Sequence, residues 1–250
     1  MRKVNRYFQQ FQILTALRLI LFGFFKKMLN PKAIITYSQF GEDQYIQTLL
    51  NSIQKGFYLD IGCNHPIRFS NTFGLYCTGW RGICVDANQN LIREFSKVRK
   101  RDKTIYAAVS DEEIEMDFYE STLDLASTLN SSFVEGEWME RNYELKEKRR
   151  MKTVTLNTIL TDFFKANQNQ APQRIDLLCI DVEGHDFNVL KSIDIEKYRP
   201  SLIVIEMHGF NKIKPNENEI YQYMNKHNYE LAGYHIINGF FIARGFSGPV

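Results

Sequence analysis

The stretch GFYLDIGCNHPIRFSN, residues 56–71, begins like a nucleotide-binding loop and then departs from that pattern. Its apolar run carries an acid, Asp60, and is followed by a turn glycine, Gly62. A dinucleotide-binding loop would place further glycines where this chain has Asn64 and Pro66. A pyrophosphate needs free backbone N–H groups, and Pro66 has none. The loop therefore favours a cofactor that carries no diphosphate.

The flanking sequence alternates short apolar runs with amphipathic stretches, which predicts a parallel sheet covered by helices on both faces. We expect strands at 57–61, 82–86, 104–109, 175–182 and 201–207. We expect helices at 41–53, 70–79, 90–98 and 185–193, and a short strand leading into a helix at 153–164.

The C-terminal segment 228–244 is predicted to form two strands joined by Asn238 and Gly239, a pair typical of a type I′ hairpin. A hairpin that closes a parallel sheet adds an antiparallel strand to it. This combination favours a Rossmann-like methyltransferase-type sheet over a plain dehydrogenase-type sheet.

Length and composition are those of one large α/β domain, with 250 residues, of which 44% are apolar and 24% charged. We assign residues 36–250 to this domain and expect 121–150 to be an insertion that shapes an acceptor pocket. The net charge of +2 gives no electrostatic case for nucleic acid. We interpret the basic runs 97–101 and 146–152 as solvated faces.

The cysteines lie at positions 63, 77, 84 and 179, a spacing that matches neither a CxxC metal pattern nor a small disulfide framework. Three of them lie in or beside apolar strand-like runs, where a thiol behaves as a small buried hydrophobe. We therefore expect reduced thiols and a cytoplasmic protein.

The N-terminal segment 1–35 differs from the rest, because basic residues flank a mostly apolar stretch at 11–25. That stretch contains Arg18 and is shorter than the roughly 20 apolar residues that cross a bilayer. A helix lying on the inner face of a membrane through residues 1–30 is one interpretation. A helix packed on the domain or on a partner subunit is the other.

The strand after the opening loop ends in Asp86, 24 residues beyond Gly62. An acid at this place accepts the ribose hydroxyls of an adenosine cofactor, which is compatible with NAD and with S-adenosylmethionine (SAM). SAM carries no phosphate, so the presence of Asn64 and Pro66 in place of glycines does not weaken the case for SAM binding. Gly62 supplies a tight turn for its amino-acid end, and Asp60 suits its ammonium and sulfonium charges.

A second polar cluster follows the most apolar strand and comprises Asp181, Glu183, His185 and Asp186. These residues fit a strand-to-helix turn in which the acids serve the helix dipole. They also fit a site where a hydroxyl is deprotonated. The next strand ends in Glu206, Met207 and His208, which add a carboxylate and an imidazole at the same edge of the sheet.

Blocks of sequence in this order resemble the FkbM family of SAM-dependent methyltransferases. They are SQFGEDQYI (38–46), YLDIGCNHPIRFSNT (58–72), GWRGICVDAN (79–88), AAVSD (107–111), TLNTIL (155–160), IDLLCIDVEGHDFNVLKSID (175–194) and RPSLIVIEMH (199–208). The resemblance covers about residues 36–210. It implies a class I methyltransferase fold with a mostly parallel seven-stranded sheet, SAM as methyl donor, and O-methylation of a hydroxyl on a sugar, polyketide or similar metabolite.

The resemblance also implies roles for individual positions. Asp60, Gly62 and Asn64 would line the methionine end of SAM. Asp86 would hold the ribose, Ser110 or Asp111 would lie near the adenine, and Glu42 would face the same pocket. Asp181, Glu183 and His185 would stand beside the transferred methyl group.

An alcohol needs a base to take its proton as the new bond forms. We expect His185 in that role, oriented by Glu183 or Asp181, with His208 as the second choice. A divalent metal held by Asp181 with Glu183 or Glu206 is a less favoured route. Rival readings are a non-catalytic SAM-binding or partner-binding domain in a glycan-assembly complex, and an NAD-linked oxidoreductase. A membrane-bound N-terminal helix would favour a lipid-linked or surface polysaccharide as acceptor.

Overall fold

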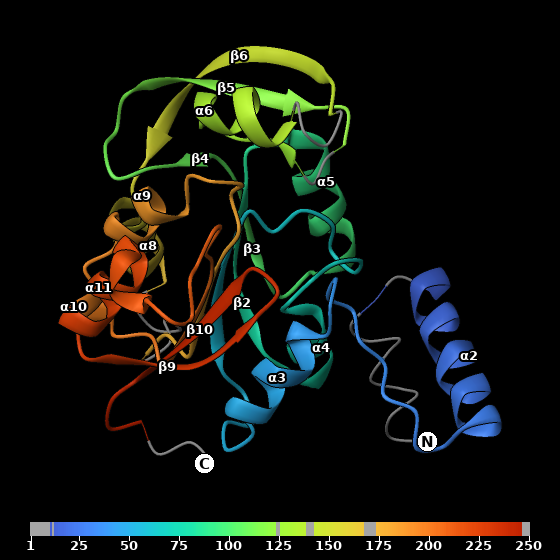
Figure 1. Ribbon diagram of the computed structural model, residues 1–250. Coiled ribbons are helices and arrows are strands. Elements are labelled where there is room, and N and C mark those ends of the chain that lie inside the picture. Colours follow the sequence, from blue (N-terminus) through green and yellow to red (C-terminus); the bar gives the residue numbers. More distant parts are fainter. Residues whose placement is uncertain (1–10, 12, 124–125, 139–142, 168–173, 247–250) are drawn as a thin grey trace.

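The computed structural model describes residues 11, 13–123, 126–138, 143–167 and 174–246, and its centre is a seven-stranded sheet (Figure 1). The strand order is β3-β2-β1-β7-β8-β10-β9. All described neighbours pair in parallel except β10, which is antiparallel to both β8 and β9. The strands span Phe57–Ile61 (β1), Arg81–Asp86 (β2), Lys103–Tyr106 (β3), Leu177–Ile180 (β7), Leu202–Glu206 (β8), Tyr229–His235 (β9) and Asn238–Ala243 (β10).

The order of the strands fixes where a ligand can bind. From β1 the chain proceeds outward to β2 and β3, and it later returns to the other side of β1 to form β7 and β8. Connections therefore leave β1 and β7 in opposite directions, and a crevice opens at the carboxyl ends of these strands. The loop that follows β1, quoted above, lies at this switch point.

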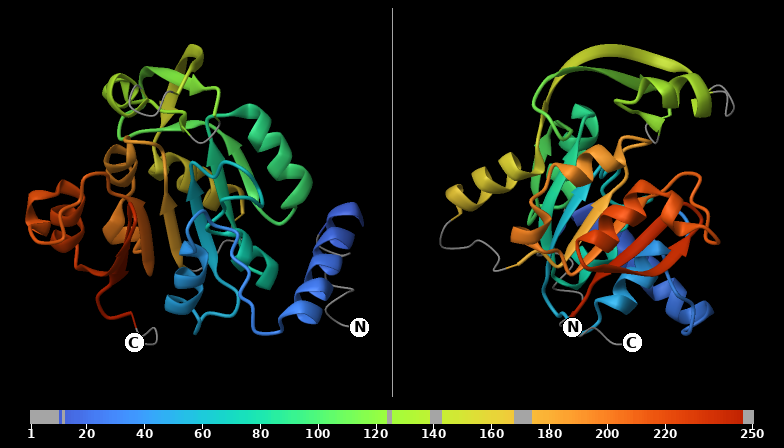
Figure 2. Two further views of the ribbon diagram at one scale, coloured as in Figure 1. Left: turned by 45° about the vertical axis from the view of Figure 1, so that its right-hand side comes forward. Right: turned by 60° about the vertical axis from the view of Figure 1, so that its left-hand side comes forward.

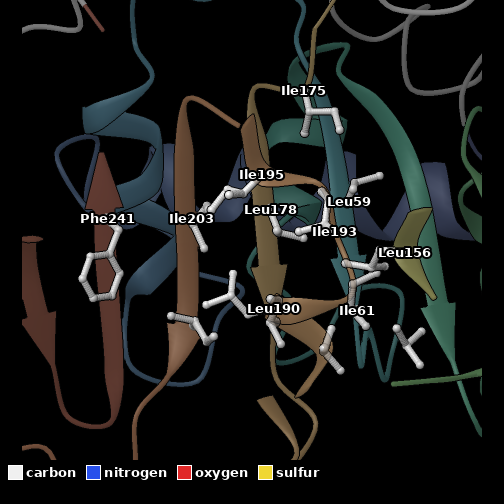
Figure 3. Packing of buried hydrophobic residues seen from close by; sticks show 14 of the residues in the cluster. Leu59, Ile61, Leu156, Ile175, Leu178, Leu190, Ile193, Ile195, Ile203 and Phe241 are labelled. Carbon is white, nitrogen blue, oxygen red and sulfur yellow. The ribbon is translucent and has the colours of Figure 1, made fainter. Parts of the chain in front are cut away.

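Helices cover both faces of the sheet, as the apolar strands predict (Figures 1 and 2). Because neighbouring side chains in a strand point to opposite faces, Leu59 and Ile61 pack on one side and Tyr58 on the other. Figure 3 shows the first of these layers. Its helices are α8 (Leu156–Ala166), α9 (Asp186–Lys191), α10 (Ile195–Tyr198) and α11 (Glu219–Lys226), and α3 (Glu42–Leu49), α4 (Phe73–Thr78) and α5 (Gln89–Val98) cover the opposite face.

The expected single strand at 104–109 is divided between two sheets, so that prediction is wrong. β3 ends at Tyr106, and the next strand, β4 (Ala108–Val109), pairs with Thr153 and Val154 instead. The chain turns away at Ala107, whose N–H donates a hydrogen bond to the carbonyl of Asp86 (3.1 Å). Strand β4 thereby leads the chain from the main sheet into the insertion.

The predicted insertion at 121–150 lies within a longer segment, 115–154, which forms a flap above the carboxyl end of the main sheet (Figures 1 and 2). The flap consists of β5 (Glu115–Ser121), α6 (Ser131–Phe133), a π-helical turn η2 (Val134–Trp138) and β6 (Leu145–Val154). β5 and β6 are antiparallel. Charged pairs hold them together, with Lys146 Nζ 2.6 Å from Glu120 Oε1 and Lys148 Nζ 2.9 Å from Asp117 Oδ2.

The C-terminal hairpin is confirmed, but its turn is not at Asn238 and Gly239. The turn lies at Ile236 and Ile237, with Ile236 in the left-handed region (φ 56°), and Asn238 already pairs with Glu206 of β8. Moving a turn by two residues leaves each side chain on the same face of the sheet. Pairing with β8 therefore decides the position of the turn against the local preference for Asn-Gly.

The N-terminal helix α2 (Ile13–Leu29) lies beside the domain (Figures 1 and 2). Among its described residues only Ala16 is buried. Phe11, just before the helix, packs against the rings of Phe73 and Tyr76, with centroids 5.9 and 5.7 Å apart. No helix among the described residues is both long and apolar enough to span a bilayer.

Candidate active site

A cavity of about 240 Å³ opens at the carboxyl ends of β1, β2, β7 and β8. Seven residues that the sequence analysis selected line it: Gly62, Asn64, Asp86, Asp181, Glu183, His185 and Glu206. Residues of the flap and of the C-terminal hairpin complete the wall, among them Phe118, Thr128, Tyr143 and Asn238. The structure therefore gathers two separate sequence clusters and the insertion around one space.

Gly62 allows the loops after β1 and β7 to touch. Its φ of +76° is a conformation that glycine adopts readily, and a Cβ there would lie 1.7 Å from the carbonyl oxygen of Asp181. Any side chain at position 62 would collide with the backbone that follows β7, so the fold requires glycine here whether or not a ligand binds. This contact brings Asp181 to the edge of the opening loop.

Asp86 is held in place by the backbone around it. Its Oδ2 accepts a hydrogen bond from the N–H of Asn64 (2.9 Å), and its Oδ1 accepts one from the N–H of Asn88 (2.7 Å). Asn64 reaches this position in the left-handed region, with φ 48°. Asp86 is thus an oriented acceptor on the cavity wall, as an adenosine ribose requires.

Asp60 faces away from the cavity. Its carboxylate is buried and accepts a hydrogen bond from Thr72 Oγ1, which in turn accepts one from the Arg99 guanidinium (2.8 Å). Burial raises the pKa of Asp60, while the charge of Arg99 and the Thr72 hydroxyl oppose this rise. A direct contact between Asp60 and a ligand stays a prediction that this placement does not support.

Arg99 itself corrects the interpretation of the run 97–101 as a solvated face. Its side chain is fully buried, and its Nε lies 2.8 Å from Asp102 Oδ2. It also donates to the hydroxyl of Tyr58 (2.7 Å). A buried cation requires such partners, and these partners lie on β1 and after α5. Arg99 therefore anchors the strand that carries the opening loop.

His185 is the N-cap residue of α9 and is buried on the cavity wall. Its Nε2 lies 2.9 Å from Ser110 Oγ, and the Ser110 hydroxyl donates to Asp111 Oδ1 (3.1 Å). A hydroxyl has one proton, so His185 Nε2 is the donor to Ser110. The neutral ring then keeps its lone pair on Nδ1. Ser110 and Asp111 do not line the cavity, and their predicted contact with adenine gains no support.

The hydrogen-bonded series His185, Ser110, Asp111 ends in the negative charge of the Asp111 carboxylate. Asp111 receives Lys191 Nζ at 2.7 Å and Asn188 Nδ2 at 2.9 Å. Burial would raise the pKa of Asp111, but the hydrogen bonds from Lys191, Asn188 and Ser110 outweigh it and lower the pKa to about 2. Burial lowers the pKa of His185, opposed by the charge of Asp111. His185 is therefore a neutral imidazole near pH 7.

Asp181 and Asp186 form a pair of carboxyl groups beside the cavity. The side chain of Asp181 is exposed in the open cavity, and the protein that encloses this cavity disfavours its charged form and raises its pKa to about 7. The charges of Asp186 and Asp60 add to the rise. Asp186 accepts backbone hydrogen bonds from Val182 (3.0 Å) and Gly184 (2.9 Å), which favour its ionised form. Burial nevertheless raises the pKa of Asp186 to about 6, so the two carboxyl groups titrate together.

Glu183, Glu206 and His208 form a second group, in which one ligating atom of each lies within 4.8 Å of the others. Glu206 is buried, and its Oε2 lies 3.0 Å from His208 Nε2. His208 does not line the cavity and packs against Phe133, with ring centroids 5.4 Å apart. Two carboxylates and an imidazole suit a divalent cation. The sequence analysis placed Asp181 in this set, whereas the structure places His208 there.

Glu42 lies behind the cavity wall. Its Oε2 accepts a hydrogen bond from the N–H of Phe40 (2.9 Å), and Oε1 is 3.4 Å from Asn238 Nδ2. Phe40 and Asn238 both line the cavity, but Glu42 does not. Glu42 therefore joins the start of α3 to the hairpin strand β10. Its predicted direct contact with the ligand gains no support, because Phe40 and Asn238 line the cavity in its place.

The sequence analysis missed the residues that fasten the flap to the loop after β7. Thr128 Oγ1 donates to the carbonyl of Glu183 (2.7 Å), and Asn130 Nδ2 donates to the carbonyl of Gly184 (2.7 Å). Asn130 also caps α6 through its side-chain oxygen. An Asn at a possible helix start was the one sequence signal available. Only the fold shows that Thr128 and Asn130 bind residues 55 and 54 positions away.

The charge of the wall is one-sided. Asp86, Asp181, Glu183 and Glu206 line the cavity, whereas its described lining includes neither lysine nor arginine. A phosphate or diphosphate would meet a lining in which acidic side chains predominate, and its binding would be opposed. A ligand that carries positive charge is favoured by the same arrangement.

Comparison with known families agrees with this geometry. Residues 60–231 match the family described as the methyltransferase FkbM domain. The chain has no significant match among curated proteins or among solved structures. The matched range begins at the acid of the opening loop and includes the cavity residues of β1, β2, β7 and β8. With a family match over more than half of its length and a Rossmann-like sheet, the chain belongs to the FkbM methyltransferase family.

Proposed function

We propose that the chain is a SAM-dependent O-methyltransferase. The family supports a methyltransferase, and the observation that carries the choice of cofactor is the charge of the cavity wall. Four acidic side chains, with neither lysine nor arginine in the described lining, suit a molecule that carries an ammonium and a sulfonium group. The same wall opposes the diphosphate of NAD.

The residues present fit SAM at three places. Asp86 presents an oriented carboxylate for the ribose hydroxyls. Gly62 and Asn64 supply a tight turn of backbone for the amino-acid end. Ala107, Ala108 and Val109 form an apolar wall beside Asp86, which suits the flat adenine ring. When bound, SAM supplies a methyl group made electrophilic by the attached sulfonium sulfur.

His185 is the base that the geometry supports best. The chain Asp111, Ser110 and His185 holds the ring, and Nδ1 remains the basic atom. The proton of the acceptor hydroxyl passes to Nδ1 as the oxygen–carbon bond forms and the carbon–sulfur bond breaks. Asp111 stabilises the imidazolium across Ser110. Glu206 and His208 form another pair, with Oε2 and Nε2 3.0 Å apart.

A hydroxyl on a sugar, a glycan or a secondary metabolite is the proposed acceptor. The cavity lining combines amide and hydroxyl groups with aromatic rings. Amides and hydroxyls both donate and accept hydrogen bonds, which matches polyhydroxylated compounds. The residues that support this choice are Gln39, Ser127, Thr128 and Asn238, together with Phe69, Phe118 and Tyr143.

Titration calorimetry of the full chain tests the cofactor. We expect SAM to bind and NADH to give no heat, and Asp86→Ala to weaken SAM binding by about tenfold or more through loss of charge-assisted hydrogen bonds. Asp162→Ala, an exposed acid on α8, is the matched control and should bind as the parent does.

Binding of NADH without a response to SAM would overturn the assignment. Binding of SAM without methyl transfer in a screen of hydroxylated acceptors with labelled SAM would instead favour a non-catalytic SAM-binding domain. The two measurements therefore separate the cofactor from the reaction.

A further inference from the structure

The helix α2 leaves a large apolar surface exposed. We call this surface the α2 face, made of Ile13, Leu14, Leu17, Leu21, Phe22, Phe24, Phe25, Met28 and Leu29. Their side chains are between 42% and 79% exposed, with Leu17 and Leu29 at the two extremes. A soluble monomer rarely exposes so many adjacent large apolar residues.

The opposite side of the helix explains why this face stays free. Ala16 is fully buried, and Leu19 packs in the same small cluster with Phe11, Phe73 and Tyr76. At 100° per residue, Ala16, Leu19 and Gly23 lie on one side of the helix, and the α2 face takes up the other half of its circumference. The domain therefore fixes the helix from one side and presents the other outward (Figures 1 and 2).

Charge is distributed very unevenly along the chain. The first 41 residues contain seven lysines and arginines and no acid, whereas the remaining residues contain 24 lysines and arginines against 29 acids. The N-terminal segment thus carries +7 and the rest of the chain −5. Of these cations, Arg18, Lys26 and Lys27 lie on α2 itself.

Such a helix matches a negatively charged lipid surface. Its apolar half can enter the boundary between headgroups and acyl chains, and its cations attract anionic lipids. Crossing the bilayer is excluded for the described helix. Pairing of two copies through the α2 face would bring segments of +7 together, and their repulsion opposes it. Attraction to anionic lipids meets no such cost.

We propose that α2 is an interfacial helix that holds the protein on anionic membranes. The aromatic and aliphatic side chains of the α2 face enter the membrane, and Lys26 and Lys27 contact the headgroups. Arg18 reaches the headgroups by extending its long side chain from the helix. The inference concerns α2 alone and does not depend on the proposed reaction.

Flotation of the full chain with vesicles tests this proposal. We expect flotation with phosphatidylcholine vesicles that contain phosphatidylglycerol, and weak flotation with phosphatidylcholine alone. Leu21→Glu with Phe25→Glu should abolish flotation. Lys26→Gln and Lys27→Gln should each weaken partitioning about fivefold, and salt should weaken it further. Ile213→Glu is the matched control, since Ile213 is 91% exposed elsewhere, and it should float like the parent.

Absence of flotation for the parent on anionic vesicles would overturn the proposal. So would equal loss in the Ile213→Glu control. A stable dimer in light scattering without lipid, which Leu21→Glu with Phe25→Glu converts to a monomer, would show that the α2 face binds protein and would also overturn it. Circular dichroism and SAM titration of each variant establish that the fold is retained.

Discussion

The Nε2 atom of His185 lies 2.9 Å from Oγ of Ser110, and this contact fixes which ring nitrogen can act as a base. Ser110 does not line the cavity, so the role that we propose for it in the reaction is an indirect one. It would position the ring of His185 and is itself held by Asp111. In the proposed mechanism this arrangement orients the neutral imidazole to accept a proton.

Replacement of the two residues should separate their roles. His185→Ala should lower kcat about 100-fold or more, and Ser110→Ala about tenfold, because the ring then rotates and changes tautomer. Neither change should alter SAM affinity in calorimetry. Ser110→Ala should also shift the acid limb of the kcat–pH profile, which a purely structural defect would not do.

The control for this pair is Ser96→Ala, an exposed serine on α5. It should leave both kcat and the pH profile unchanged. If His185→Ala keeps the full kcat, His185 is not the base, and the pair of His208 and Glu206 becomes the next choice.

SAM binding should release a proton through Asp181. Its pKa of about 7 in the free protein means that it is partly protonated near neutrality, and a bound cation favours the carboxylate. Affinity for SAM should therefore rise between pH 6 and pH 8. Calorimetry at pH 6.5 in two buffers of different ionisation enthalpy measures the release, and Asp181→Asn should abolish both effects.

The same group should make folding stability depend on pH. The folded pKa of Asp181 is raised above its unfolded value of about 3.9, so the folded state binds more protons between about pH 4 and pH 7. Stability from this group consequently falls as pH rises through that window. Asp181→Asn should raise Tm relative to the parent more at pH 8 than at pH 4.5. An equal change at both pH values would contradict the raised pKa.

Gly62→Ala should destabilise the fold. The left-handed φ and a Cβ that meets the backbone of Asp181 together cost about 3 kcal/mol, since neither backbone can yield cheaply. Thermal unfolding should show a clear drop in Tm. Gly136→Ala is the matched control, because no heavy atom outside its local backbone lies within 4 Å of its added Cβ, and its Tm should change little.

Chelation separates base catalysis from metal catalysis. If His185 supplies the base, protein treated with EDTA should keep its methyl transfer rate. A metal would be assigned to Glu183, Glu206 and His208 by two results together. EDTA would abolish activity and Mg²⁺ or Mn²⁺ would restore it, whereas in Glu206→Gln the added metal would not restore it.

The main sheet was predictable because its strands are short, apolar and separated by helices with clear periodicity. β1 matches the predicted span 57–61, and β2 and β8 agree within one or two residues. Local preference failed where tertiary pairing competes with it. The Asn-Gly turn gave way to pairing with β8, and the apolar run at 104–109 was divided by the entry into the flap.

The site was predictable at the level of strand ends but not of side-chain direction. The carboxyl ends of parallel strands meet at one edge, so Gly62, Asp86 and Asp181 could be grouped from sequence. The direction of the Asp60 side chain depends on Arg99. Arg99 stands in a run of basic residues, and such a run does not indicate that one of its members is buried. The roles of Ser110 and Thr128 likewise depend on contacts between distant segments.

The flap and the loop after β7 share hydrogen bonds, since Thr128 and Asn130 hold the carbonyls of Glu183 and Gly184. Arg149 of the flap also donates to the carbonyl of Ala87, next to Asp86 (2.8 Å). The flap, the loop after β2 and the loop after β7 are therefore joined to one another directly by hydrogen bonds. The three segments that surround the cavity form one connected unit, and a change in any one of them would be felt by the other two.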